Sequence, residues 1–333
     1  MKITRKMVAE RAGVTKESVS YVLNRSRPVS NEIVKKVMEA VEELGYVPDV
    51  AARSLRDKGS MSLGVICNDL SNPYYAEIIN GIDEAAQEAG YTVLVVGADG
   101  HIRKKIQNFT VRRVDGIVFL AFPDKMDYDV ETLATEKIAF VVSHNVAYVG
   151  KNGAHLEPNF PNGFDETMAA IKDAGHLKIA YLSAFGEDYT YDDRLESFKA
   201  AHRKYFQTEP QVYFADCVDT TVENGRRLVE KYFDELKEYT VILTSNDMMA
   251  IGCMQALKKR GVRIPEDVSV VGVDNMMFSE LVTPSLATIG YDKKAYGKKL
   301  FQLLLKNIED KIVVFERFPM QFLKRESLRV IKK

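Results

Sequence analysis

The stretch ERAGVTKESVSYVLN, residues 10–24, decides how the start of the chain folds. Gly13 supplies the conformational freedom for a tight break, and Thr15 then stands where a side chain can cap a second helix. The apolar residues Val19, Val22 and Leu23 follow at i, i+3 and i+4, the spacing of one helix face. Two short helices joined by a tight turn predict a helix-turn-helix, a motif whose second helix enters the major groove of DNA.

The residues on both sides of this stretch complete a small bundle. Thr4 can cap a first helix that runs through Glu10, and Ser30 can cap a third helix over residues 31–44, with Gly45 as its stop signal. The third helix carries one apolar stripe, made of Ile33, Val34, Val37, Met38, Val41 and Leu44. We therefore expect three helices before residue 46.

Composition and charge limit the rest of the chain. Its 333 residues, 46% hydrophobic and 28% charged, are typical of a globular protein with two or three domains. Residues 1–60 hold 12 basic and 8 acidic side chains, whereas residues 61–333 hold 34 and 39. A basic head on an acidic body suits a head that binds phosphates. Without an apolar run of 18 residues or a signal peptide, we expect a cytoplasmic protein that does not bind membranes.

The sequence contains no common signature of catalysis or metal binding. GxGxxG, Walker A, GxSxG and HExxH motifs are all missing, and the five histidines form no spaced cluster. Cys67, Cys217 and Cys253 are far apart and lack metal-ligand spacing, so we expect buried structural thiols. We predict no enzymatic activity, no cofactor and no metal.

From Leu63 onward, short apolar strands alternate with helical segments. One set of strands covers residues 63–67, 91–96, 115–120 and 138–142, and a second set covers 178–183, 211–214, 240–245 and 268–273. Helices are expected at 74–89, 191–205, 222–236 and 247–260. This alternation predicts an α/β core of two doubly wound parallel-sheet lobes behind the all-α head. The cleft between two such lobes is the expected ligand site.

The ordered motifs of nearly the whole chain closely resemble the lactose-repressor (LacI/GalR) family of bacterial transcription regulators. They include AGVTKESVSYVLN, VSNEIVKKVMEAVEELGYVPDVAARSL, LGVICNDLSNPYYAEIINGIDEAAQEAGY and SNDMMAIGCMQALKKRGVRIPEDVSVVGVDN. The resemblance implies a DNA-binding head at 1–47, a hinge helix at 48–60 and a core at 61–333 that resembles periplasmic sugar-binding proteins. The core lobes are expected at about 61–156 with 290–318, and 157–289 with 319–333.

The resemblance also implies a homodimer on a palindromic operator. Lys16 and Glu17 match the positions that mainly set base preference, Tyr21 matches a third, and Leu55 matches a leucine that wedges a base step in the minor groove. The complete set of expected DNA contacts is Thr4, Thr15, Lys16, Glu17, Ser20, Tyr21, Asn24, Ala52 and Leu55.

A small effector is expected between the lobes. By resemblance its contacts are Asp69, Tyr74, Tyr75, His144, Asp188, Arg194, Thr220, Asn246 and Asp274. Arginine, asparagine and aspartate give directional bonds to the hydroxyls of a polyol, and tyrosine rings cover its C–H faces. Asp188 stands where purine-binding relatives have an arginine, and near Thr220 this chain lacks the aromatic platform that relatives usually have. Ser143, His144 and Asn145 stand where most members have an aspartate after the fourth strand.

These features predict a repressor of a carbohydrate-utilisation operon whose operator affinity responds to a neutral sugar. Two alternatives remain open at this point. One is a regulator of the same type with a nucleobase or other non-sugar effector. The other is a binding or enzymatic module that does not bind DNA and whose head is vestigial.

Overall fold

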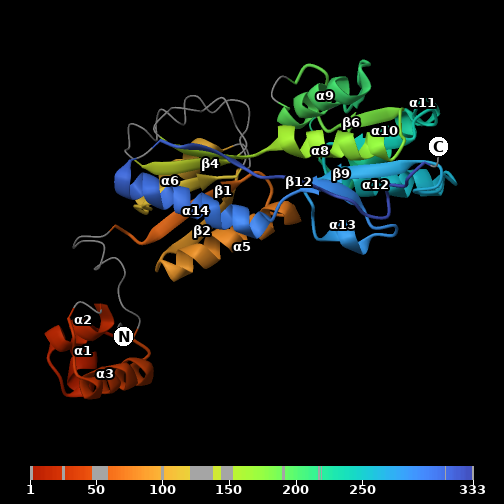
Figure 1. The fold of residues 1–333 in the computed structure, drawn as a ribbon. Helices are drawn as coiled ribbons and strands as arrows, with labels where there is room; N and C mark the ends of the chain where they lie inside the picture. The colour runs from red at the N-terminus through yellow and green to blue at the C-terminus, as the bar shows by residue number, and fades with distance from the viewer. Residues whose placement is uncertain are drawn as a thin grey trace. The chain divides into compact units, whose positions relative to one another are not determined.

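The chain divides into two compact units, Met1–Met61 and Ser62–Lys333 (Figure 1). The structure, a computed structural model, describes residues 3–24, 27–46, 59–98, 101–120, 138–143, 153–189, 192–216, 218, 220–311 and 313–331. Most of the predicted hinge, including Ala52 and Leu55, lies outside the described residues.

The first unit is the predicted helix-turn-helix head. It contains α1 (Arg5–Ala12), α2 (Lys16–Asn24) and α3 (Asn31–Leu44), which enclose a small apolar core around Val8, Val19 and Val37. Two of the three predicted caps are present: Thr4 Oγ1 accepts from the Met7 amide at 3.4 Å and Thr15 Oγ1 accepts from the Ser18 amide at 3.1 Å. Gly13 ends α1 with φ +65°, a conformation that costs glycine little.

Helix α3 has the predicted bounds and differs from the prediction in two details. Ser30 precedes the helix, but its side chain makes no cap hydrogen bond. In the predicted apolar stripe, Val37 is fully buried, whereas Val34 is 36% and Met38 is 50% exposed. A core shared by three short helices covers only a narrow strip of α3, so the outer residues of the stripe stay in contact with solvent.

The first lobe of the second unit is a parallel sheet in the order β11-β5-β4-β3-β1-β2. Its strands are β1 (Ser62–Cys67), β2 (Thr92–Gly97), β3 (Gly116–Phe119), β4 (Ala139–Ser143), β5 (Ala154–Pro158) and β11 (Phe315–Phe318). Helices α5 (Pro73–Glu88) and α14 (Lys293–Asp310) run together along this lobe (Figure 1). Helix α6 (Ile102–Val111) packs on the other face of the sheet, against side chains of β1 and β3.

Helices α5 and α14 meet at glycines. A Cβ on Gly81 would overlap the carbonyl oxygen of Lys294, and a Cβ on Gly297 would overlap the carbonyl oxygen of Ile78. The two backbones therefore approach more closely than they could if either glycine were replaced by a residue with a Cβ atom. This close approach fixes the crossing point of the helices.

The second lobe has the sheet order β12-β10-β9-β8-β6-β7, in which β12 is antiparallel to β10 and the other pairs are parallel. Its strands are β6 (Ile179–Ser183), β7 (Gln211–Phe214), β8 (Val241–Thr244), β9 (Ser269–Val273), β10 (Ala287–Gly290) and β12 (Gln321–Leu323). Its helices are α8 (Phe160–Asp173), α9 (Asp193–Phe206), α10 (Val222–Lys231), α11 (Phe233–Leu236), α12 (Asp247–Lys259) and α13 (Phe278–Leu281).

Alternation along the strands separates the two faces of this sheet. Tyr181 and Leu243 pack with α8 and α9, whereas their neighbours Ala180 and Ile242 pack with α10 and α12. Because successive strand residues point to opposite faces, strands buried on both sides must be apolar throughout, as these are. The predicted α/β fold class is confirmed.

The structure adds elements that the sequence patterns did not reveal. Strands β5, β10, β11 and β12 were not predicted, and the helix expected over 222–236 is divided into α10 and α11 at Tyr232. The chain passes from one lobe to the other after β5, after β10 and after β11, so these added strands flank the crossings between the lobes.

Two further sequence expectations concern cysteines and membranes. Cys67 and Cys253 are buried free thiols, and burial raises the pKa of Cys67 to about 11. Cys217 lies outside the described residues. In the described parts of the chain, no helix combines the length and the apolar character that crossing a bilayer requires.

Candidate functional site

The first turn of α2 presents polar side chains to solvent. Thr15, Lys16 and Glu17 are exposed, while Val19 on the opposite face is fully buried in the head. Ser20 and Tyr21 are half-buried, and the guanidinium carbon of Arg27 lies 5.3 Å from the Tyr21 ring centre. Lys16 and Glu17, the predicted base-reading residues, thus have side chains exposed on the first turn of α2. The side chain of Asn24 lies outside the described residues.

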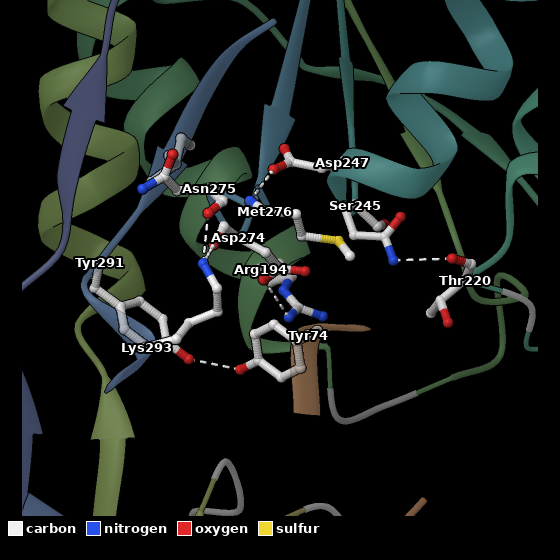
Figure 2. Close-up of polar contacts among 12 residues, drawn as sticks. Tyr74, Arg194, Thr220, Ser245, Asp247, Asp274, Asn275, Met276, Tyr291 and Lys293 are labelled. Atoms are coloured by element: carbon white, nitrogen blue, oxygen red, sulfur yellow. Dashed lines mark hydrogen bonds and ion pairs between the residues drawn. The ribbon is translucent and has the colours of Figure 1, made fainter. Parts of the chain in front are cut away.

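Arg194 and Asp274 form the centre of the predicted effector site. Arg194 Nη2 lies 2.9 Å from Asp274 Oδ1, although 80 residues separate them in the chain (Figure 2). The Arg194 side chain is 17% and the Asp274 side chain 5% exposed. Burial raises the pKa of Asp274. The positive charges of Arg194 and, second, of Lys293 act to lower it. The pair is a desolvated donor and acceptor that a polar ligand can engage.

Two neighbours orient Arg194. The Asp192 side chain accepts from the Arg194 and Leu195 amides and caps α9. The guanidinium carbon lies 5.1 Å from the centre of the Phe160 ring at the start of α8. Helix geometry and a cation–π contact therefore fix the direction of the guanidinium.

The backbone after β9 is held in an unusual conformation. Asp274 has φ +108° and Asn275 has φ +49°, values that cost free energy for residues other than glycine. The buried Lys293 ammonium donates to the carbonyl oxygens of Asp274, at 3.0 Å, and of Asn275. Lys293 begins α14, so its contacts tie the first lobe to the strained turn of the second (Figure 2).

Asp247 supports the same turn from within the second lobe. Its carboxylate accepts from the Met276 amide at 2.7 Å, from Ser279 Oγ at 2.5 Å and from Thr288 Oγ1 at 2.6 Å. Burial, followed by the charge of Asp274, raises the pKa of Asp247 to about 7, against the opposing effect of these hydrogen bonds. The turn that presents Asp274 is thus fixed from two sides.

Aromatic hydroxyls lie on the first-lobe side of the site. The Tyr74 and Tyr291 hydroxyl oxygens are 2.6 Å apart (Figure 2). The Tyr75 ring meets the Tyr74 ring edge-on, with centres 5.1 Å apart. Burial raises the pKa of Tyr74, Tyr75 and Tyr291, so all three carry neutral hydroxyls at pH 7.

Other predicted contacts have structural roles of their own. The Asn246 side chain caps α12 by accepting from the Met249 amide at 2.9 Å, and its Nδ2 donates to the Thr220 carbonyl oxygen, also at 2.9 Å. Asp69 is exposed and accepts from the Ser71 amide and hydroxyl, and Asp188 is exposed in the turn after β6. His144 lies outside the described residues.

The structure therefore brings Tyr74, Tyr75, Arg194 and Asp274 together and joins Asn246 to Thr220. Sequence reasoning missed Phe160, Asp192, Asp247, Tyr291 and Lys293. Two of these had a local signal, because Asp192 and Asp247 stand where helix-capping and first-turn acids are common. Lys293 and Tyr291 had none, because their role depends on a crossing between the lobes.

Residues 4–49 match the family model of bacterial regulatory proteins of the lacI family, and residues 168–328 match a periplasmic binding protein-like domain. The chain is 30% identical over 312 residues to the HTH-type transcriptional repressor PurR of Photobacterium profundum, covering 92% of each chain. It is 31% identical over 338 residues to PurR of Vibrio vulnificus, covering 98% of this chain and 99% of that one.

Solved structures give the same fold. The lac repressor dimer bound to operator and the anti-inducer ONPF matches with a TM-score of 0.83 at 25% identity, over 98% of this chain and 99% of that one. A complex of the transcriptional regulator CelR with cellobiose matches with a TM-score of 0.72 at 22% identity, with the same coverage. The head, the two-lobed core and these full-length relatives show that the chain belongs to the LacI family of bacterial regulatory proteins, as a DNA-binding transcriptional repressor.

Proposed function

We propose that this repressor controls a carbohydrate-utilisation operon and that a small neutral sugar between the core lobes sets its operator affinity. The observation that carries the proposal is the buried Arg194–Asp274 pair, 2.9 Å apart. Its guanidinium donors and carboxylate oxygens match the mixed donors and acceptors of adjacent sugar hydroxyls. The neutral hydroxyls of Tyr74 and Tyr291 add groups that can both donate and accept.

Two features favour a sugar over a purine. Asp188 is acceptor-only when ionised, so it cannot donate to the acceptor atoms of a purine. Thr220 offers no aromatic face on which a flat base could stack. A nucleobase effector is the second candidate, and it is favoured by the similarity to PurR repressors.

Within the head, we assign base reading to Lys16 and Glu17, with Ser20, Tyr21 and Asn24 extending the contact. Thr4 and Thr15 lie at helix N-termini, where amide groups and the helix dipole favour a phosphate. Ala52 and Leu55 are assigned to the minor groove within a hinge at 48–60, between a head at 1–47 and the core.

The assembly proposed is a homodimer. Helix α13 and its N-cap residue Met277 expose three apolar side chains, with exposed fractions of 56% for Met277, 37% for Phe278 and 71% for Leu281. Contiguous apolar side chains on a surface mark an interaction site, and a palindromic operator requires a second copy of the head. Light scattering is expected to give a dimer, and Leu281→Asp is expected to weaken it.

Coupling between effector and DNA follows from contacts that join the lobes. Lys293 and Tyr74 belong to the first lobe and reach the Asp274 turn and Tyr291. A ligand with different affinities for two arrangements of the lobes shifts their populations, and with them the spacing of the two heads.

The test is fluorescence anisotropy of a labelled operator selected from random half-sites, with competitor DNA at fixed salt. A cognate sugar is expected to change operator affinity at least about tenfold, within the usual range of allosteric coupling. Arg194→Ala should remove this sugar response. Arg203→Ala is the matched control, because Arg203 lies on the exposed side of the same helix and pairs with Glu209. A sugar response that survives in Arg194→Ala would refute the proposed site.

A further inference from the structure

Helix α13 follows directly after the turn that presents Asp274. Residues 275–277 alone join Asp274 to the start of the helix at Phe278. The carboxylate proposed to bind the effector and the apolar side chains proposed to meet a second copy of the chain therefore belong to one short segment.

Arg325 holds both parts of this segment. Its Nη2 donates to Asn275 Oδ1 in the turn and to Glu280 Oε1 on α13, each at 2.7 Å. Its Nη1 donates to the Leu286 carbonyl oxygen at 2.9 Å, and only 10% of the side chain is exposed. Because the guanidinium is planar and its donors have fixed directions, a shift of one acceptor must move Arg325 or break a hydrogen bond.

Asp247 makes a second connection between the turn and α13. Its Oδ2 accepts from the Met276 amide at 2.7 Å (Figure 2). The same oxygen accepts from Ser279 Oγ at 2.5 Å, and both Asp247 and Ser279 are fully buried. Breaking a buried hydrogen bond leaves a desolvated polar group unpaired, so two donors that share one buried acceptor are expected to move together.

Helix α13 is fixed on its inner side and apolar on its outer side. The exposed apolar side chains are those of Met277, Phe278 and Leu281, whereas the Ser279 side chain is buried. Glu280 lies between Ser279 and Leu281, is exposed as well, and carries the ion pair with Arg325. A second copy packed on this surface would therefore lie against a helix that Arg325 ties to the effector turn.

Given the homodimer proposed above, we propose that Arg325 and Asp247 hold the effector turn and α13 as one rigid unit, which couples effector binding to self-association. Arg325 is a positioning residue that acts through Asn275 in the turn and Glu280 on the helix. Coupling between two binding events is reciprocal, so a change in the turn alters the dimer, and loss of the dimer alters the turn.

The test is subunit exchange, followed by fluorescence energy transfer after donor-labelled and acceptor-labelled full-length proteins are mixed. Asn275→Gly removes the oxygen that Arg325 holds, and glycine adopts the positive φ of this position without strain. This variant is expected to exchange subunits at least about fivefold faster than wild type, the lower end of the usual coupling between sites.

Two variants control for the chemistry and the backbone of Asn275→Gly. Asn275→Asp keeps an oxygen acceptor for Arg325 and should restore exchange to within about twofold of the wild-type rate. Gln207→Gly, at the exposed end of α9, places glycine at a similar φ of +56° and should leave the exchange rate unchanged.

A reverse measurement guards against a local defect in Asn275→Gly. Leu281→Asp, once light scattering shows it to be monomeric, is expected to speed amide hydrogen exchange in residues 272–276 at least about fivefold, although these residues precede the apolar surface. No energy transfer between wild-type subunits at any concentration would overturn the proposed dimer and the coupling together. Equal subunit exchange in wild type and folded Asn275→Gly, or unchanged hydrogen exchange in monomeric Leu281→Asp, would overturn the coupling alone.

Discussion

Asp247 gives the second lobe a pH-dependent stability that one substitution should remove. Its carboxylate is fully buried, and its pKa is about 7 in the folded chain against an ordinary value of 3.8. The unfolded chain therefore loses this proton near pH 4, whereas the folded chain keeps it until about pH 7. Between these values the folded state binds more protons, so stability falls as pH rises.

The size of this effect follows from the two pKa values. One pKa unit corresponds to about 1.36 kcal/mol, so Asp247 destabilises the fold by about 2 kcal/mol at pH 5 and about 4 kcal/mol at pH 8. Wild type should thus lose about 2–3 kcal/mol between these pH values through Asp247 alone. Asp247→Asn should lack this loss and should be at least as stable as wild type at pH 8.

The assay is urea unfolding followed by far-ultraviolet circular dichroism at pH 5 and pH 8. Other groups also titrate in this range, so the informative quantity is the difference between wild type and variant at each pH. Asp173→Asn, an exposed acid at the end of α8, is the control and should give a difference that does not change with pH. If the difference for Asp247→Asn is equally constant, the raised pKa and the reasoning from it are refuted.

Three further predictions concern packing, capping and base reading. Gly81→Ala should force α5 away from α14 and destabilise the core by about 1–3 kcal/mol, seen as a lower urea midpoint; an unchanged midpoint would contradict the close contact. Thr15→Ala should cost the head about 1 kcal/mol in thermal unfolding, whereas Ser30→Ala, which removes no cap bond, should cost much less; equal losses would refute the capping assignment. Lys16→Ala with Glu17→Ala should change the motif selected from random half-sites, and an unchanged motif would show that neither residue reads bases.

The fold was largely predictable because its main signals are local. Apolar runs such as residues 240–245 are too short for a typical helix and indicated strands buried on both faces, and Gly13 with Thr15 marked the turn of the head. Two of the missed strands, β5 and β11, carry polar residues that break such a pattern. β5 contains His155 and Glu157, and β11 reads FERF, so neither has the continuous apolar run of a strand buried on both faces.

The site was predictable only where the family resemblance supplied positions. Arg194 and Asp274 were expected and are paired, but no periodicity relates two residues 80 positions apart. Lys293 and Tyr291 could not be found because their contacts form only when the chain crosses back between the lobes. Asn246 was expected to contact the ligand, and in the structure its side chain caps α12. An asparagine amide has the hydrogen-bonding groups for either role, so its residue type alone did not distinguish them.

We propose that a neutral carbohydrate binds at the Arg194–Asp274 pair. The most direct measurement is calorimetric titration of the full-length protein with a panel of mono- and disaccharides, together with hypoxanthine and guanine. We expect one sugar to bind with a dissociation constant between about 1 μM and 1 mM, about −8 to −4 kcal/mol, and its binding to be lost in Arg194→Ala and Asp274→Ala. Tight binding of hypoxanthine or guanine, with no response to any sugar, would contradict the account.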